Sequence, residues 1–179
     1  KGYTDKEKAT NRFGQTIPPG SQPALRWPWR LMGYIDHGIE GSILINDQLE
    51  KYRNEGMDDY SVSVFPSFGL NYWNLGGNTI NTSENAPGLV ERMSQAKSPG
   101  NLIVFASSRV NATIDTYQHG FFRINAPRDS PYVWSTTYSY NLFAEQLGNV
   151  DPRYKDKAVV THLDGHGEAI GIEELRDMR

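Results

Sequence analysis

The sequence contains no cysteine among its 179 residues, so neither disulfide bonds nor thiolate chemistry can contribute to its fold or function. A zinc ion would have to be bound by the four histidines and by carboxylates. Cysteine proteases and deaminases with cysteine-bound zinc are therefore excluded.

The chain also lacks long hydrophobic runs and an excess of positive charge. An apolar run such as residues 102–106 falls far short of the roughly 20 residues that a membrane-spanning helix needs, so we expect no membrane span. The net charge of −3 and the pI near 5.8 provide no general basic field for phosphates. We therefore expect a soluble domain that does not bind nucleic acid.

The sequence does contain enough hydrophobic residues to form one core. A length of 179 residues with 37% hydrophobic content suits one well-packed domain. Residues 1–23 are polar and end in a stretch rich in proline and glycine, which is typical of extended and turn conformations. We therefore predict a lead-in arm over residues 1–23 and a single domain over residues 24–179.

Beyond the arm, the apolar pattern predicts about six or seven strands and two or three short helices. Residues 102–106 and 158–163 are runs rich in branched apolar residues, typical of buried strands. Residues 61–65 alternate with period two, which favours a half-buried strand. Other predicted strands cover residues 121–125 and 132–138, and short helices are predicted between Asn46 and Gly56 and from Pro87 to about residue 96. The absence of a βαβ rhythm indicates an α+β fold.

Three polar motifs follow one another along the chain. They are the arginine pair Arg26 and Arg30 among tryptophans, the triplet of Asn81, Thr82 and Ser83, and Glu145 shortly before the sequence Gly-Asn-Val-Asp-Pro at 148–152. Cleavage of nicotinamide from NAD needs an anchor for the diphosphate, a polar strand end for the nicotinamide ribose, and a carboxylate that stabilises the developing oxocarbenium charge. An arginine, a hydroxyl cluster and a glutamate meet these needs.

The order and spacing of these motifs resemble the Arg, Ser-Thr-Ser, Glu layout of the mono-ADP-ribosyltransferase toxins of the cholera and pertussis type. The resemblance runs from about residue 25 to residue 160. It implies a mixed, mainly antiparallel two-sheet fold with short helices, and a glycosyltransferase that uses NAD as co-substrate to transfer ADP-ribose to a target-cell macromolecule. It also implies a virulence effector that is secreted or delivered into a target cell as part of a larger toxin or delivery assembly.

The resemblance also implies roles for particular residues. Arg26, at the end of an early strand, would bind the diphosphate or the adenosine ribose, and Glu145 would stabilise the transition state. Catalytic roles fall to Arg26, Ser83 and Glu145, and NAD-binding roles to Arg26, Arg30, Asn81, Thr82 and Ser83. Tyr72 or Trp73 could stack on the nicotinamide.

The chain departs from the family pattern at three places. Asn81 stands where the first serine is expected, although its side chain can both donate and accept hydrogen bonds. Residues 27–29 replace the usual Arg-x-Asp core. Phe143 stands where Glu or Gln normally precedes the catalytic glutamate, and it cannot position an arginine guanidinium as a carboxylate would. An acceptor other than arginine, or plain NAD hydrolysis, is favoured by this last change.

Several alternatives remain open. The Ser-Thr-Ser equivalent could be Ser107 and Ser108, or residues 135–137 with Glu168 as the carboxylate. Arg26 and Arg30 could be surface residues stacked on aromatic rings. The chain could also be a non-enzymatic β-rich module that binds carbohydrate or protein through exposed aromatic residues.

The histidines offer a further alternative. His162 and His166 would share one face of a helix and could bind a metal, which would make the chain a metal-dependent hydrolase. Gly165 and Gly167 indicate a turn instead, so we predict no metal site. His37 and His119, each before a glycine, are interpreted as turn residues.

Overall fold

The computed structural model describes residues 8–38, 43–44, 58–72, 74–75, 90, 92–111, 117–125, 134–137, 139 and 143–177. The chain divides into two compact units, Lys1–Ser67 and Phe68–Arg179, and each has a hydrophobic core of its own. The boundary that we predicted after residue 23 therefore lies inside the first unit. A single domain over residues 24–179 stays a prediction.

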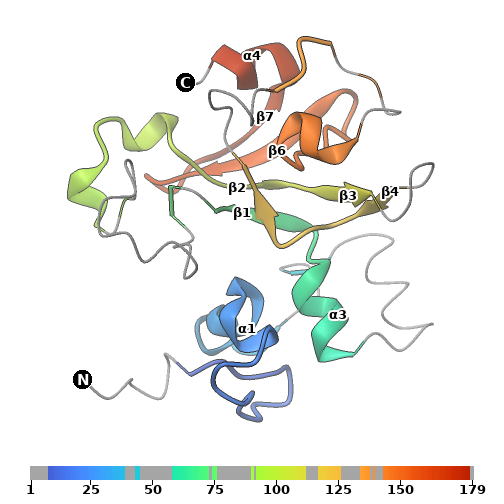
Figure 1. Ribbon diagram of the computed structural model, residues 1–179. Helices are drawn as coiled ribbons and strands as arrows, with labels where there is room; N and C mark the ends of the chain where they lie inside the picture. Colours follow the sequence, from blue (N-terminus) through green and yellow to red (C-terminus); the bar gives the residue numbers. More distant parts are fainter. Residues whose placement is uncertain are drawn as a thin grey trace. The chain divides into compact units, whose positions relative to one another are not determined.

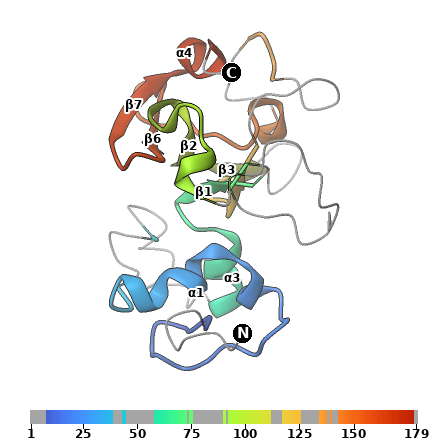
Figure 2. The ribbon, with the colours of Figure 1, turned by 90° about the vertical axis from the view of Figure 1, so that its left-hand side faces the viewer.

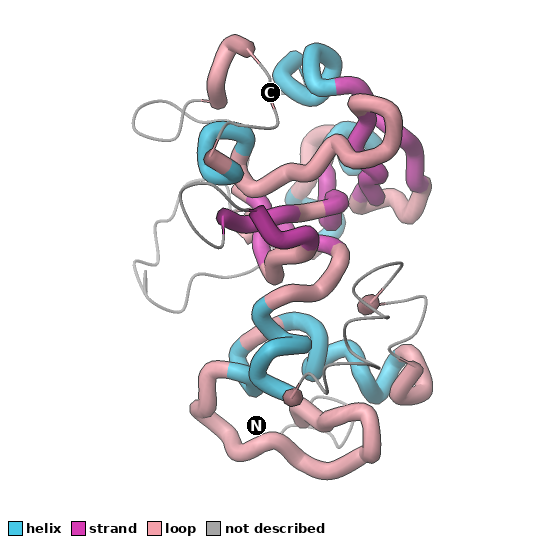
Figure 3. The backbone as a smooth tube through the Cα atoms, turned by 90° about the vertical axis from the view of Figure 1, so that its right-hand side faces the viewer, coloured by secondary structure: helices cyan, strands magenta, loops and turns pink. Residues whose placement is uncertain are grey.

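Short helices make up most of the regular structure described in the first unit (Figure 3). They are the 3₁₀-helices η2 (Pro23–Leu25) and η3 (Met32–Tyr34) and the α-helices α1 (Trp27–Leu31) and α3 (Asp59–Val64). Pro23 is the first residue of η2 and Pro28 the second of α1, and in the first turn of a helix the missing N–H of proline costs nothing. Trp29 is fully buried and its Nε1 donates to the Asp59 carbonyl at 2.9 Å, which ties α1 to α3. The unit's core consists of Ile17, Ala24, Trp29, Met32, Ile43, Leu44 and Val62.

The predicted lead-in arm takes part in this core. Ile17 is buried with Ala24, and the Thr10 N–H donates to the Trp29 carbonyl at 3.1 Å. Residues 10–17 are therefore packed against α1 and belong to the first unit.

The strand predicted over residues 61–65 is wrong, because α3 occupies this segment. Asp58 caps the helix, and its carboxylate accepts a hydrogen bond from the Ser61 N–H at 2.7 Å. Val62 faces the core. The cap and the burial of Val62 outweigh the strand preference of the alternating valines.

The second unit is built on a five-stranded sheet with the order β5-β1-β2-β6-β7 (Figure 1). Three pairings are antiparallel and β1 pairs with β5 in parallel. A separate two-stranded sheet joins β3 and β4. The strands are β1 (Phe68–Asn71), β2 (Ile103–Ser107), β3 (Arg109–Asn111), β4 (Tyr117–His119), β5 (Arg123–Ile124), β6 (Lys157–His162) and β7 (Gly167–Gly171). The predicted α+β class is confirmed at this level, as a mainly antiparallel mixed fold.

Helical segments of the second unit are short. They are η4 (Met93–Gln95), η5 (Pro99–Asn101), η6 (Ala144–Leu147) and α4 (Ile172–Asp177). Figure 2 shows α4 following directly from β7, and Leu175 of α4 is buried in the unit's core. None of the helices that the structure describes is long and apolar enough to cross a bilayer.

Individual elements of this unit confirm some predictions and correct others. The strands predicted at 102–106 and 158–163 are present as β2 and β6, and β5 is shorter than the predicted 121–125. Residues 134–137 of the predicted strand 132–138 are irregular. Of the helix predicted from Pro87, the described part contains only η4, and residues 46–56 lie outside the described residues.

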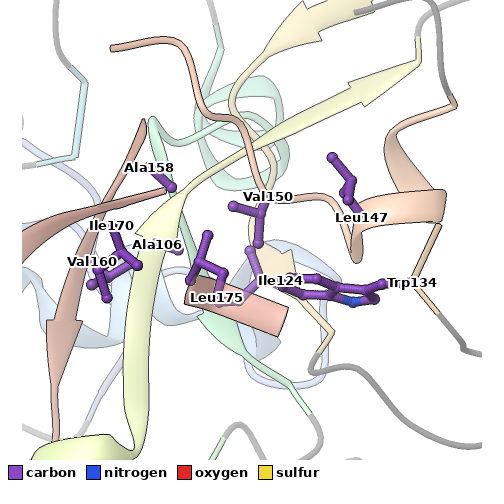
Figure 4. Close-up of a cluster of buried hydrophobic side chains, with 9 residues drawn as sticks. All are labelled: Ala106, Ile124, Trp134, Leu147, Val150, Ala158, Val160, Ile170 and Leu175. Atoms are coloured by element: carbon purple, nitrogen blue, oxygen red, sulfur yellow. The ribbon is translucent and has the colours of Figure 1, made fainter. Parts of the chain in front are cut away.

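Trp134 fixes this irregular segment to the core of the second unit. Its indole is buried, and Nε1 donates to the Asn125 carbonyl at 3.1 Å, so the side chain serves as a core residue held by one polar contact. Figure 4 shows the side chains of this core. They are Ala106, Ile124, Trp134, Leu147, Val150, Ala158, Val160, Ile170 and Leu175.

Candidate functional site

Glu145 lies on η6 and its side chain is exposed. The residue before it, Ala144, and the residue two positions after it, Leu147, are both buried. The Ala144 N–H donates to Oδ1 of Asn111 on β3. The short helix is thus held by its buried residues and by the bond to Asn111, while the side chain of Glu145 is exposed to solvent.

The turn after Glu145 has an unusual backbone. Gly148 and Asn149 have φ values of 58° and 66°, the left-handed region that glycine and asparagine tolerate best. A Cβ on Gly148 would lie 2.0 Å from the Asn125 carbonyl oxygen and 2.6 Å from Trp134 Nε1, so only glycine fits there. Asn149 is buried and its carbonyl accepts from the Arg109 N–H at 2.9 Å.

A fully buried carboxylate follows this turn. Asp151 Oδ2 lies 2.6 Å from His119 Nδ1 and 3.3 Å from Arg153 Nη1. These two partners compensate for the burial of the charge. His119 is the last residue of β4 and pairs with Arg109, so it is a strand residue and not the turn residue that we predicted. The sequence carries no spacing signal that links Asp151 to a histidine so far away along the chain.

The first rival triplet, Ser107 and Ser108, is buried and bonded to the backbone. Ser107 Oγ donates to the Asp151 carbonyl at 2.6 Å and accepts from the Val159 N–H at 3.1 Å. Ser108 Oγ donates to the Phe121 carbonyl and accepts from the Phe121 N–H. Both hydroxyls thus hold neighbouring chain segments together, which favours a structural role for this pair.

The second rival triplet, residues 135–137, lies in an irregular segment. The Ser135 N–H donates to the Gln146 carbonyl at 2.8 Å, and Thr136 and Thr137 line an open hollow beside Glu173 and Arg176. Glu168, the carboxylate proposed to accompany this triplet, is not among the residues that line the hollow.

The arginine pair belongs to the first unit. Arg26 lies between η2 and α1 and not at the end of a strand, because Pro23 and Pro28 favour a helical start on each side of it. Its Nη1 donates to Ser63 Oγ at 2.8 Å, and the guanidinium lies 4.9 Å from the centre of the Tyr60 ring. This contact agrees with the aromatic-stacking alternative. Arg30 is exposed in the last turn of α1.

The remaining predicted residues are placed only in part. Asn81, Thr82, Ser83 and Trp73 lie outside the described residues. Tyr72 is half-buried, and the Arg123 guanidinium lies 5.1 Å from the centre of its ring.

The β6–β7 hairpin brings together a second group of titratable side chains. His162 Nε2 and His166 Nε2 lie 3.1 Å and 3.5 Å from Glu168 Oε1, and the two imidazole rings are stacked with their centres 4.1 Å apart. His166 Nδ1 lies 2.6 Å from Asp164 Oδ1. This hydrogen bond raises the pKa of His166. The pKa of Asp164 is lowered, most by a hydrogen bond from the backbone N–H of His166 and next by the one from the His166 ring.

We predicted no metal site here because the glycines argued against a helix. The hairpin turn nevertheless brings His162, His166 and Glu168 within metal-binding distance of one another. The sequence contains these ligands in the seven residues His-Leu-Asp-Gly-His-Gly-Glu. A metal site could have been predicted from them only by assuming a hairpin and not a helix.

Comparison with protein-family models, with curated proteins and with solved structures finds no match to this chain. The roles of its residues therefore rest on their chemistry and on the order of the sequence motifs.

Proposed function

We propose that the chain is a NAD-dependent mono-ADP-ribosyltransferase domain of a toxin or effector, with Glu145 as the catalytic carboxylate. One observation carries the proposal: Glu145 is exposed on η6, a short helix in which Ala144 and Leu147 are buried and the Ala144 N–H is bonded to Asn111. The backbone of Glu145 is held in place in this way, and its negative charge can stabilise positive charge that develops beside it.

In the proposed reaction, the bond between C1′ of the nicotinamide ribose and the ring nitrogen breaks. The bonding electron pair goes to the ring nitrogen, so that neutral nicotinamide leaves and the ribose becomes an oxocarbenium-like cation. Glu145 stabilises this cation electrostatically. A nucleophile of the acceptor then attacks C1′ and gives up its proton.

Binding of NAD is assigned to the polar motifs found in the sequence. The resemblance assigns the diphosphate to Arg26 and Arg30, since guanidinium groups pair well with phosphate oxygens. For Arg26 this requires exchange of its contacts with Ser63 and Tyr60 for contacts with NAD. The resemblance assigns the nicotinamide ribose of NAD to Asn81, Thr82 and Ser83.

NAD hydrolysis is the second candidate function, and Phe143 favours it. This residue is 45% exposed at the beginning of η6, two positions before Glu145. An exposed phenyl ring has no charge with which to orient an arginine acceptor, whereas water needs no such partner.

The first experiment measures nicotinamide release from NAD by the purified chain. Glu145→Gln preserves size and hydrogen-bonding capacity but removes the negative charge, and we expect release to fall roughly 10²–10³-fold. The matched control is Gln146→Ala, the adjacent exposed residue on the same helix, which should stay near the wild-type rate.

Two results would contradict the assignment. Equal rates for wild type and Glu145→Gln would remove Glu145 from the reaction. A loss confined to Glu168→Gln would move the site to the β6–β7 hairpin. If the wild type is active, labelled NAD incubated with cell lysate separates the two candidate functions, because transfer labels a macromolecule and hydrolysis releases free ADP-ribose.

A further inference from the structure

We propose that His162, His166 and Glu168 form a binding site for a divalent transition-metal ion of the zinc type. His162 ends β6, Glu168 lies near the start of β7, and His166 is in the turn that joins them. The site is independent of the proposed NAD chemistry.

The spacing of the three side chains fits a small ion. Bonds of about 2.0–2.1 Å from a tetrahedral zinc ion place its ligand atoms about 3.3–3.4 Å apart. Glu168 Oε1 is 3.1 Å from His162 Nε2 and 3.5 Å from His166 Nε2, on either side of this value. All three ligand atoms lie within 4.8 Å of one another, so one ion can contact all three groups once the His166 ring has turned.

The burial of His162 points independently to a ligand. Its side chain is 0% exposed, and neither ring nitrogen has a hydrogen-bond partner within the part of the chain that the structure describes. The close approach of Glu168 to Nε2 does not count as a hydrogen bond, because proximity alone does not give the required direction. A buried polar nitrogen without a partner is costly, and coordination at Nε2 would remove this cost.

The environment of His166 prepares it as a second ligand. Its Nδ1 lies 2.6 Å from Asp164 Oδ1, and an N–H donated to this carboxylate keeps the proton on Nδ1. The lone pair of the neutral ring is then on Nε2, the nitrogen nearest to Glu168. Metal-binding histidines very commonly have such a carboxylate partner.

The donor set also selects the kind of ion. Two imidazole nitrogens and one carboxylate suit zinc, cobalt or nickel, whereas calcium and magnesium prefer oxygen ligands. Three protein ligands leave a coordination position for water, as in catalytic zinc sites.

Binding requires one local change. The two imidazole planes are within 5° of parallel, and an ion cannot lie in both planes when the rings are stacked. His162 is buried and His166 is 45% exposed, so we expect the His166 ring to turn while the His162 ring stays in place.

The test uses the full chain and zinc ions alone, without NAD. Calorimetric titration should give one zinc ion per chain, and Glu168→Gln and His166→Asn should each weaken binding at least tenfold. Asp164→Asn keeps all three ligands but loses the carboxylate partner of His166, and we expect a 10–100-fold loss of affinity. Glu174→Gln, an exposed glutamate of α4, is the matched control and should bind as the wild type does.

A second measurement separates a real site from surface binding. Cobalt in place of zinc should give the strong visible absorption of four-coordinate cobalt, and binding should shift the NMR signals of both histidine rings. Equal affinities for wild type, Glu168→Gln and His166→Asn would overturn the proposal, as would a weak six-coordinate cobalt spectrum. Circular dichroism of each variant confirms that a loss of binding is not a loss of folding. Because NAD is absent, these outcomes do not depend on the proposed transferase activity.

Discussion

Replacing Gly148 by alanine adds one methyl group, and we expect it to lower the free energy of unfolding strongly. Gly148 has a φ of 58°, and a Cβ there would lie 2.0 Å from the Asn125 carbonyl oxygen and 2.6 Å from Trp134 Nε1. Neither neighbour can move freely, because the Asn125 N–H donates to the Gly148 carbonyl at 2.9 Å and Trp134 is buried in the core.

Three contributions add up in the Gly148→Ala variant. The left-handed backbone costs a residue with a Cβ about 1–2 kcal/mol. Forcing a methyl group into a packed region costs about 1–3 kcal/mol, and the displaced hydrogen bonds of Asn125 cost about 1 kcal/mol each. We therefore expect the free energy of unfolding to fall by about 4–7 kcal/mol, a large part of the roughly 5–15 kcal/mol that stabilises a typical domain.

Urea denaturation followed by tryptophan fluorescence and circular dichroism measures this loss. Gly165→Ala is the matched control, since Gly165 also has a positive φ, 96°, but no atom lies within 4 Å of the position that a Cβ would occupy there. It should show only the backbone cost. If Gly148→Ala and Gly165→Ala differ by less than about 1 kcal/mol, the clash with Asn125 and Trp134 does not control stability and the reasoning fails.

Two further predictions concern charged groups. Asp58→Ala should lower the unfolding free energy by about 1 kcal/mol at neutral pH. The Ser61 N–H holds the pKa of Asp58 below its usual 3.8, so this stabilisation is present above the unfolded-state pKa and is lost as the pH falls through the lowered folded-state pKa. Urea denaturation at several pH values measures this loss. Asp151→Ala should cost about 3–5 kcal/mol in the same assay, because it removes the buried carboxylate that both His119 and Arg153 contact.

Each of these predictions has a control. Asp58→Asn keeps an N-capping side chain but cannot titrate, so it should retain most of the stability and lose the pH dependence; a pH profile like that of the wild type would contradict the account. Asp177→Ala removes an exposed carboxylate and should change stability by less than about 0.5 kcal/mol. An Asp151→Ala variant as stable as Asp177→Ala would show that the buried charge contributes nothing.

Local sequence predicted the two central strands well and the peripheral elements poorly. Residues 102–106 and 158–163 are apolar and rich in branched side chains, so β2 and β6 follow from composition alone. β7 has two glycines and one buried apolar residue, Ile170, and its pairing with β6 gives it a strand conformation that its own residues do not favour. Tertiary contacts of this kind are invisible in a short sequence window.

In the candidate sites, too, local sequence predicts some features, whereas others depend on tertiary contacts. The role that its motif implied for Glu145 stays a prediction, and the buried contact between Asp151 and His119 joins residues 32 positions apart without a recognisable pattern. The spacing of His162 and His166 predicts a shared face only if the segment is a helix, whereas a hairpin is the element that brings these two side chains together.

The pairing of the strands also has a consequence for the order of folding. β6 and β7 are joined by a short turn and pair over residues 157–161 and 167–171, so little chain entropy is lost when they meet. β2 reaches β6 only across a long stretch of chain, and the bond from Val159 to Ser107 spans 52 positions. The β6–β7 hairpin is therefore expected to form early, as a template on which β2 and then β1 assemble, and closure of the sheet should limit the folding rate.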